Sequence, residues 1–542
     1  MPAAHRPVVL IIRDGWGHNP RSDQDFCNAT VQGATPVSDR LLAEYPHVQI
    51  KTSGTDVGLP PGVMGNSEVG HQNLGAGRIV DQELMRITNA VTSGAFQENS
   101  TLLEAVNRAK SSGKVVHLLG LLSDGGVHSH IDHCLALVDL CKRAGLPADQ
   151  LAVHVITDGR DTAPNGGAEY VKTLEAKLAE AGYPPVASVI GRFYAMDRDF
   201  RWDRVQKAYD LLLGRGGQPT DSAGAALAAY YENPTEPERA GDEFVAPYYT
   251  NYPAGTGPKN GGRIADGDSV IFYNFRGDRP REITKAFVLD DADWGAIKGG
   301  GFDRAPVPQD LFFCTMARYE TGLDTQVAFE KPPKMKGILG DVVGAAGLTQ
   351  FRCAESEKAP HVTFFFNDYR EDAFPGETQL EIPSPRDVST YDQKPEMSAR
   401  GVTDAVLDQI AKDGADFILV NYANGDMVGH TGVLEAAVKA VEVVDGCVGE
   451  IVDAALAKGG ALVVTADHGN CEQMVDLESG RPHTAHTTYD VDLVVVAEDL
   501  TSKGTGGRTL REGGRLADVA PTVLDLLGVD KPAEMTGESL LA

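Results

Sequence analysis

Short apolar segments rich in β-branched residues recur along the chain, and most of them end in a polar cluster. PVVLII (7–12) runs into RDG, and LAVHVI (151–156) runs into TDGRD. Near-continuous apolar residues are typical of parallel strands that are covered on both faces. Further strands are predicted at 114–122, 185–191, 269–275, 361–367, 416–422, 461–466 and 491–497.

Helical patterns lie between these segments. Apolar residues recur at helical spacing and stop at glycine in 101–113, 168–182 and 434–460. The alternation of strands and helices predicts an α/β protein with mainly parallel sheets. Residues 215–265 lack a clear pattern and are predicted to form loops. Ligands of open α/β sheets bind at the carboxyl ends of the strands, so the polar clusters are candidate sites, although any one of them could be ordinary loop polarity.

The chain has 542 residues, which predicts more than one domain, and a formal net charge of −28 at pH 7. So acidic a surface argues against nucleic acid and anionic membranes as partners. It does not exclude a small anionic ligand, which would need a local concentration of arginine and lysine.

The cysteines and the N-terminal segment indicate the compartment. Seven cysteines, an odd number without C-x-x-C spacing, predict buried reduced thiols instead of a disulfide framework or a zinc knuckle. The first apolar run is too short for a signal peptide, and no stretch approaches the roughly 18 apolar residues of a membrane helix. A soluble cytoplasmic protein is expected.

Metal-type ligands follow three of the predicted strands. NYANGDMVGHTG places an aspartate and a histidine at i, i+4, on one helical face. Carboxylates with neutral imidazoles suit Mn²⁺, Zn²⁺ or Fe²⁺, and this many ligands could hold two ions, a known device for phosphoryl displacement. Each pair alone could be a helix cap or a satisfied loop, but the three sets together favour a metal centre. The candidates are Asp14, Asp426, His430, Asp467, His468, His483 and His486.

Ser67 is the candidate nucleophile. In GVMGNSEVGHQNLGAGR (62–78) a tight turn precedes Ser67, which is expected at or near the N-cap of a helix. A capping serine is a routine alternative. The nucleophile interpretation needs an activator, which a bound divalent cation and the helix N-terminus could supply.

Arginines concentrate in the middle of the chain, again at predicted strand ends, where they could bind phosphate and carboxylate. A salt-bridged face is the alternative, most plausibly for Arg201 and Arg204. His128 and Asp161 could serve substrate hydroxyls, whereas a metal site at HSHIDH (128–133) is not favoured. The anion-binding candidates are Arg160, Arg192, Arg198, Arg276, Arg279 and, ahead of the predicted strand at 361–367, Lys358.

These motifs closely resemble those of the cofactor-independent (2,3-bisphosphoglycerate-independent) phosphoglycerate mutases of the alkaline phosphatase superfamily. They occur in the family's order across nearly the whole chain, which is more specific than any one motif. The matching segments are DGWG (14–17), MGNSEVGHQNLGAGR (64–78), SDGGVHSH (123–130), DGRDT (158–162), GRFYAMDRDFRWDR (191–204), SEKAPHVTFFFN (356–367), PSPRDVSTYDQKPEMSA (383–399), NYANGDMVGHTG (421–432), TADHGN (465–470) and TAHTT (484–488).

The resemblance implies a phosphatase-like metal-binding domain split in sequence, 1–80 and 325–542, and an inserted transferase domain, 81–324, that binds phosphoglycerate. It implies two divalent ions, most often Mn²⁺, with Mg²⁺, Zn²⁺ or Co²⁺ as alternatives, and a monomer. It assigns Asp426, His430 and His486 to one ion and Asp14, Ser67, Asp467 and His468 to the other. It assigns the substrate to His128, Arg160, Asp161, Arg192, Arg198, Arg276, Arg279 and Lys358, and gives His483 no role.

The implied reaction is the interconversion of 3-phosphoglycerate and 2-phosphoglycerate through a phosphoserine at Ser67, with Asp161 or a neighbouring residue transferring the proton. Closure of the domains about hinges near 75–82 and 315–325 would exclude water. Gly277, Ala359-Pro360 and YDVDLVVV depart from the family pattern without removing a chemical group. Rival readings are a phosphatase or another phosphomutase on the same metal core, and a non-catalytic regulator that binds metal or phosphosugar.

Overall fold

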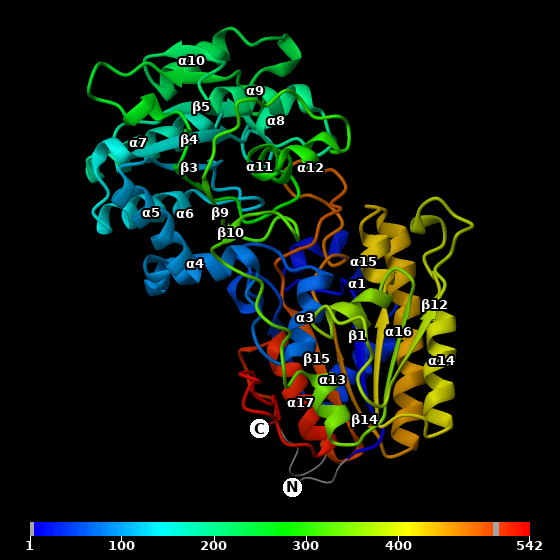
Figure 1. The fold of residues 1–542 in the computed structure, drawn as a ribbon. Helices are drawn as coiled ribbons and strands as arrows, with labels where there is room; N and C mark the ends of the chain where they lie inside the picture. Colours follow the sequence, from blue (N-terminus) through cyan, green and yellow to red (C-terminus); the bar gives the residue numbers. More distant parts are fainter. Residues whose placement is uncertain (1–4, 502–508, 542) are drawn as a thin grey trace. The chain divides into compact units, whose positions relative to one another are not determined.

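The computed structural model describes residues 5–501 and 509–541. The chain divides into two compact units: unit 1 comprises Met1–Gln82 and Pro332–Ala542, and unit 2 comprises Glu83–Lys331. Each unit holds one eight-stranded, mainly parallel sheet with helices against it (Figure 1). The predicted α/β fold class is confirmed.

The sheet of unit 1 brings together strands from both ends of the chain. Its order is β12-β11-β13-β1-β14-β15-β2-β16; β15 is antiparallel to β14 and β2, and the other pairs are parallel. The strands are β1 (Val8–Arg13), β2 (His47–Lys51), β11 (Gln350–Glu355), β12 (Glu377–Ile382), β13 (Phe417–Tyr422), β14 (Ala461–Thr465), β15 (Val491–Val496) and β16 (Gly514–Arg515). The helices are α1 (Ala29–Gln32), α2 (Pro36–Glu44), α3 (Ser67–Ala76), α13 (Leu339–Ala345), α14 (Ala399–Ala411), α15 (Asn424–Gly429), α16 (Leu434–Ala457) and α17 (Val519–Leu527).

The sheet of unit 2 has the order β10-β9-β8-β3-β4-β5-β7-β6, with only the β5–β7 pair antiparallel among the described strands. The strands are β3 (Val116–Leu121), β4 (Leu151–Thr157), β5 (Ser188–Gly191), β6 (Gln218–Thr220), β7 (Tyr248–Thr250), β8 (Ser269–Phe272), β9 (Phe312–Thr315) and β10 (Gln326–Val327). The helices are α4 (Glu83–Ser93), α5 (Ser100–Ser112), α6 (Ile131–Arg143), α7 (Gly167–Ala181), α8 (Arg192–Ala195), α9 (Trp202–Leu212), α10 (Ala223–Glu232), α11 (Arg281–Val288) and α12 (Asp291–Gly295).

The apolar strands of unit 2 are buried on both faces. In β3, Val116 and Leu118 belong to one hydrophobic cluster, while Leu119 and Leu121 belong to a second. Successive side chains of a strand point to opposite faces, so the two clusters lie on the two sides of the sheet. This burial explains why the segment at 114–122 is apolar without alternation.

Two predicted elements are wrong. Residues His361–Phe365 form a short π-helical segment after Pro360, not a strand. The apolar run there is too short for periodicity to separate a strand from a buried helical turn, and proline favours the start of a helix. The region 215–265 is not only loops, since it contains β6, α10 and β7; its alanine-rich run is a strong helix former.

All seven cysteines are buried and none forms a disulfide, as expected from the sequence. Among the described residues, no helix combines the length and the apolar character needed to cross a membrane.

Candidate active site

The carboxyl ends of three neighbouring parallel strands carry most of the predicted metal ligands. Asp14 follows β1, Asp426 lies in α15 just after β13, and Asp467 with His468 follows β14. Because β1 pairs with both β13 and β14, these three loops meet at one edge of the sheet. The strand order therefore brings residues from both ends of the chain into one cluster.

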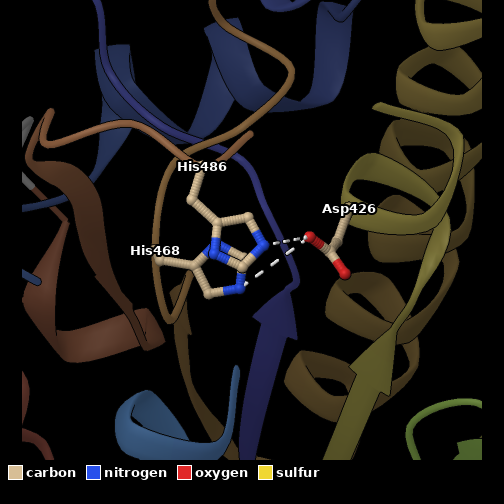
Figure 2. Close-up of side chains that lie close together, drawn as sticks. All are labelled: Asp426, His468 and His486. Atoms are coloured by element: carbon tan, nitrogen blue, oxygen red, sulfur yellow. Dashed lines mark ion pairs between the residues drawn. The ribbon is translucent and has the colours of Figure 1, made fainter. Parts of the chain in front are cut away.

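Three imidazole rings surround the carboxylate of Asp426. Its Oδ1 lies 3.1 Å from Nε2 of His430, 3.0 Å from Nε2 of His486 and 4.0 Å from Nε2 of His468. The rings of His468 and His486 stack with their centroids 4.0 Å apart, and both reach toward Asp426 (Figure 2). Ligand atoms of Asp426, His468 and His486 lie within 4.8 Å of one another, close enough to bind one cation.

The hydroxyl of Ser67 lies in an adjoining group. Its Oγ is 3.2 Å from Oδ1 of Asp14 and 3.0 Å from Nε2 of His468. The same nitrogen of His468 is 3.4 Å from Oδ1 of Asp14 and 3.6 Å from Oδ2 of Asp467. His468 thus lies between the two predicted ligand sets, and its assignment to one ion stays a prediction.

Local sequence fixes the position of Ser67. It is the first residue of α3, and the N-cap is Asn66, whose side-chain oxygen accepts a hydrogen bond from the amide of Val69 at 3.0 Å. A Cβ at Gly70 would lie 2.8 Å from Cβ of Asp467, so glycine allows α3 to approach the ligand loop. The hydroxyl therefore lies at a helix N-terminus, which favours negative charge.

Lys358 lies among the metal-ligand candidates, although the sequence predicted it to bind substrate. The side chain is buried, and Nζ lies 2.6 Å from Oγ of Ser67, 2.8 Å from Oδ1 of Asp14 and 2.6 Å from Oδ2 of Asp426. Burial opposes the charge, but the two carboxylates outweigh it and raise the pKa of Lys358. The ammonium is a fixed cation beside the serine.

The same charges shift the pKa values of the neighbouring aspartates and histidines. Burial would raise the pKa values of Asp14 and Asp426, but the ammonium of Lys358 and the hydrogen bonds of the neighbouring histidines together outweigh it and hold both well below the ordinary value. Burial lowers the pKa of His468, yet Asp467 and the other carboxylates raise it to about 10. The hydrogen bond to Asp426 raises the pKa of His430. The lowered pKa values keep Asp14 and Asp426 ionised, which suits cation binding.

Unit 2 contains a separate cluster of arginines and acids at its own strand ends. Arg192 is buried, with Nη1 at 2.6 Å from both Oδ1 of Asp158 and Oδ2 of Asp161. The side chains of Arg160, Arg198 and Arg276 are 52%, 50% and 52% exposed, so their guanidinium groups can still bind an anion.

Asp278 connects several members of this cluster. Its carboxylate lies 3.1 Å from Nε of Arg276, 3.6 Å from Nη1 of Arg198 and 3.6 Å from Nδ1 of His128. Burial and the charge of Arg192 lower the pKa of His128 to about 4, so the imidazole is neutral near pH 7. Arg279 donates to the carbonyl of Met196 at 3.3 Å, and its pKa is lowered by burial and by neighbouring guanidinium groups.

Comparisons with known proteins identify the family. A family model described as the metalloenzyme superfamily matches residues 6–531. The 2,3-bisphosphoglycerate-independent phosphoglycerate mutase of Rhodopirellula baltica is 60% identical over 99% of this chain and 97% of its own length. That of Syntrophotalea carbinolica is 49% identical over 99% and 98%.

The chain belongs to the 2,3-bisphosphoglycerate-independent phosphoglycerate mutase family. A solved structure of the phosphoglycerate mutase of Leishmania mexicana, obtained at low cobalt concentration, is 30% identical with a TM-score of 0.59 and is matched over 98% of its length and 100% of this chain. The aspartates and histidines fit the divalent cations of a metalloenzyme, since carboxylate oxygens and imidazole nitrogens lie close enough together to bind one ion.

Three residues of this mutase centre were missed by the sequence analysis. Nδ1 of His71 lies 2.8 Å from the carbonyl of Ser67 and 3.1 Å from Oδ2 of Asp467. The amide nitrogen of Asn421 lies 2.8 Å from Oδ2 of Asp14 and 2.9 Å from Nε2 of His71, and that of Asn470 donates to Oδ1 of Asp426 at 3.2 Å. The i, i+4 spacing of Ser67 and His71 was the available signal.

Other residues singled out in the sequence have structural contacts. His130 caps α6 by accepting from the amide of Asp132, and His133 lies 3.0 Å from the hydroxyl of Thr88. Arg204 pairs with an aspartate and stacks on Phe193. The backbone amide of His483 donates a hydrogen bond to the carbonyl of Met474 at 3.0 Å. A Cβ at Gly277 would lie 2.6 Å from Cα of Tyr319, so no larger residue fits there unless the loop shifts.

Proposed function

We propose that this chain is the isomerase that interconverts 3-phosphoglycerate and 2-phosphoglycerate in glycolysis and gluconeogenesis, through a phosphoserine at Ser67 and without 2,3-bisphosphoglycerate. The observation that carries the proposal is the position of the Ser67 hydroxyl, which lies within 3.2 Å of Asp14, His468 and Lys358. Two divalent cations held by the surrounding aspartates and histidines would withdraw charge from the serine and phosphoryl oxygens.

In the first half-reaction Oγ of Ser67 forms a bond to phosphorus as the ester bond to glycerate breaks. The hydroxyl proton leaves and the glycerate oxygen gains a proton, so charge is conserved. Lys358 supports this step because its ammonium lies 2.6 Å from Oγ and stabilises a negative serine oxygen. In the second half-reaction the oxygen of the other glycerate hydroxyl bonds to phosphorus as the bond to Oγ of Ser67 breaks; the hydroxyl proton leaves and Oγ regains a proton.

Unit 2 would hold the glycerate between the two steps. Arg160, Arg198 and Arg276 are exposed enough to bind the carboxylate and phosphate. Asp161, held by Arg192 at 2.6 Å, would exchange a proton with the reacting hydroxyl. His128 and Arg279 complete the substrate set. Retention of glycerate separates a mutase from a phosphatase, because water would otherwise take the phosphoryl group.

The finer assignments are also proposals. We assign unit 1 as the phosphatase-like metal-binding domain and unit 2 as the inserted transferase domain. The chain passes between the units at 82–83 and 331–332, so the hinge predicted near 75–82 lies at a boundary, whereas the one predicted near 315–325 falls inside unit 2. Asp426, His430 and His486 would hold one ion, and Asp14, Ser67, Asp467 and His468 the other. Mn²⁺ is the preferred metal, given the mixed oxygen and imidazole ligands. A cytoplasmic monomer is proposed, and the seven buried cysteines without a disulfide are consistent with the cytoplasm.

A coupled mutase assay without added bisphosphoglycerate tests the function. We expect isomer exchange that stops after chelation and returns with Mn²⁺. Steady phosphate release from 3-phosphoglycerate without isomer exchange would indicate a phosphatase instead. Ligand binding without either reaction would indicate a regulator.

A further inference from the structure

Glu472 is a buried acid outside the predicted ligand and substrate sets. Its side chain is fully buried in unit 1. Oε2 accepts hydrogen bonds from the backbone amides of Gly17 at 3.0 Å and of Asn470 at 2.7 Å. Oε1 accepts a hydrogen bond from the hydroxyl of Thr487. One carboxylate thus receives three donors from three separate positions of the chain.

Each donor belongs to a loop that carries metal-ligand candidates. Gly17 follows Asp14 in DGWG, Asn470 follows His468 in TADHGN, and Thr487 is next to His486 in TAHTT. The loops also contact one another, because the amide of Thr487 donates to the carbonyl of Gly469 at 3.1 Å and that of Cys471 to the carbonyl of Gly15 at 3.0 Å. Glu472 lies where the three loops meet.

Two glycines leave room for this carboxylate. A Cβ at Gly17 would lie 2.3 Å from Cδ of Glu472, and a Cβ at Gly469 would lie 2.3 Å from Oε1. Both approaches are far closer than van der Waals contact. The glycines of DGWG and of TADHGN therefore allow the backbone to close around Glu472. This explains why glycine stands at these two positions, which the metal ligands alone do not explain.

We propose that Glu472 is a positioning residue that sets the metal affinity of the centre by fixing the loops of Asp14, His468 and His486. The proposal rests on the proposed function of that centre. Glu472 bonds backbone amides and a threonine hydroxyl, so it acts through the loops and is not itself a ligand. Groups that orient metal ligands commonly contribute 10–100-fold to metal affinity or activity.

The variant Glu472→Gln tests this at nearly constant volume. Its side-chain NH₂ group would face a donor, so at least one of the three hydrogen bonds is lost. We expect the Kd for Mn²⁺, measured by calorimetry, to rise about 10–100-fold. In the chelated protein, the amides of Gly17 and Asn470 should exchange hydrogen faster. The control is Glu377→Gln, a buried unit 1 carboxylate that accepts from Asn367 at 3.0 Å outside these loops.

A second variant keeps the test decisive if Glu472→Gln does not fold. Thr487→Val removes one of the three donors to Glu472, together with the acceptor of the Tyr489 amide at 3.3 Å, and we expect a smaller rise in the same Kd. The inference is overturned if the folded variants bind Mn²⁺ as tightly as the wild type, or if Glu377→Gln weakens binding equally. A wild-type protein that binds no Mn²⁺ would instead contradict the metal centre itself, and this inference with it.

Discussion

The ammonium group of Lys358 lies 2.6 Å from the hydroxyl oxygen of Ser67. It also contacts Asp14 and Asp426, which belong to different proposed ligand sets. The buried ammonium of Lys358 therefore connects the nucleophile with both ligand sets. Its source is the loop after β11, the strand next to β13 in the sheet, so the strand order that gathers the ligands also delivers this lysine.

Replacing Ser67 by alanine should abolish isomer exchange. Only the hydroxyl is lost, so the other proposed ligands, Asp14, Asp467 and His468, should keep their positions while the rate falls at least about 10⁴-fold, as for other enzymes that lose their nucleophile. The coupled assay measures this, and Ser111→Ala, on the exposed part of α5, is the control. Ordinary mutase rates in a clean Ser67→Ala sample would refute the covalent route.

Replacing Lys358 by methionine should destabilise the chelated protein. Asp14 and Asp426 would remain buried without their cation, and breaking a buried ion pair costs about 3–5 kcal/mol of the free energy of unfolding. Chemical denaturation in chelator measures the loss. Lys412→Met, which breaks an exposed pair with Asp408, should cost far less. Equal stability of Lys358→Met and wild type would count against the proposed role of this lysine.

His128 should remain neutral through the physiological range. Its pKa in the folded protein is about 4, lowered from 6.5 by burial and then by Arg192. The unfolded chain takes up the proton first as the pH falls, so the stability contributed by neutral His128 is present above pH 6.5 and is lost as the pH drops toward 4. Imidazole NMR, with His128→Gln to assign the signal, should show this titration near pH 4. A midpoint near 6.5 would contradict it.

Replacing Arg276 by alanine should weaken substrate binding without changing metal affinity. Its side chain is half exposed and proposed to bind the anionic substrate, and hydrogen bonds to charged groups contribute about 1.5–3 kcal/mol, or roughly 10–100-fold in KM. Steady-state kinetics and Mn²⁺ calorimetry separate the two effects. Arg204→Ala, which loses an ion pair and a stacking contact, is the matched control. An unchanged KM for Arg276→Ala would remove this residue from the substrate set.

The sequence predicted where strands end better than it predicted which strands and side chains lie next to one another. Asp14, Asp467 and His468 follow clearly apolar strands, so their position at the sheet edge was predictable. Pairing of β1 with β13 and β14 depends on contacts between remote segments, which strand patterns do not specify. Lys358 was placed ahead of a strand at 361–367 that proved helical, and its contact with Ser67 was not predicted.

Buried polar residues outside the recognised ligand motifs were the hardest to predict. Asn421 lies at the end of β13 and contacts Asp14, but asparagine at a strand end is common and carries no distinctive signal. Glu472 resembled ordinary loop polarity, because two of its three donors, Gly17 and Thr487, lie outside its own loop in the sequence. In both cases the tertiary fold, and not the local pattern, creates the environment.

Mapping the phosphorylated residue tests the central claim most directly. The Mn²⁺-loaded protein would be mixed with 3-phosphoglycerate, quenched rapidly in acid, digested and analysed by mass spectrometry. A phosphoryl group on the peptide that contains Ser67, absent after chelation and in Ser67→Ala, is the predicted result. Isomer exchange with Ser67 unmodified, or with phosphate on another residue, would contradict the account.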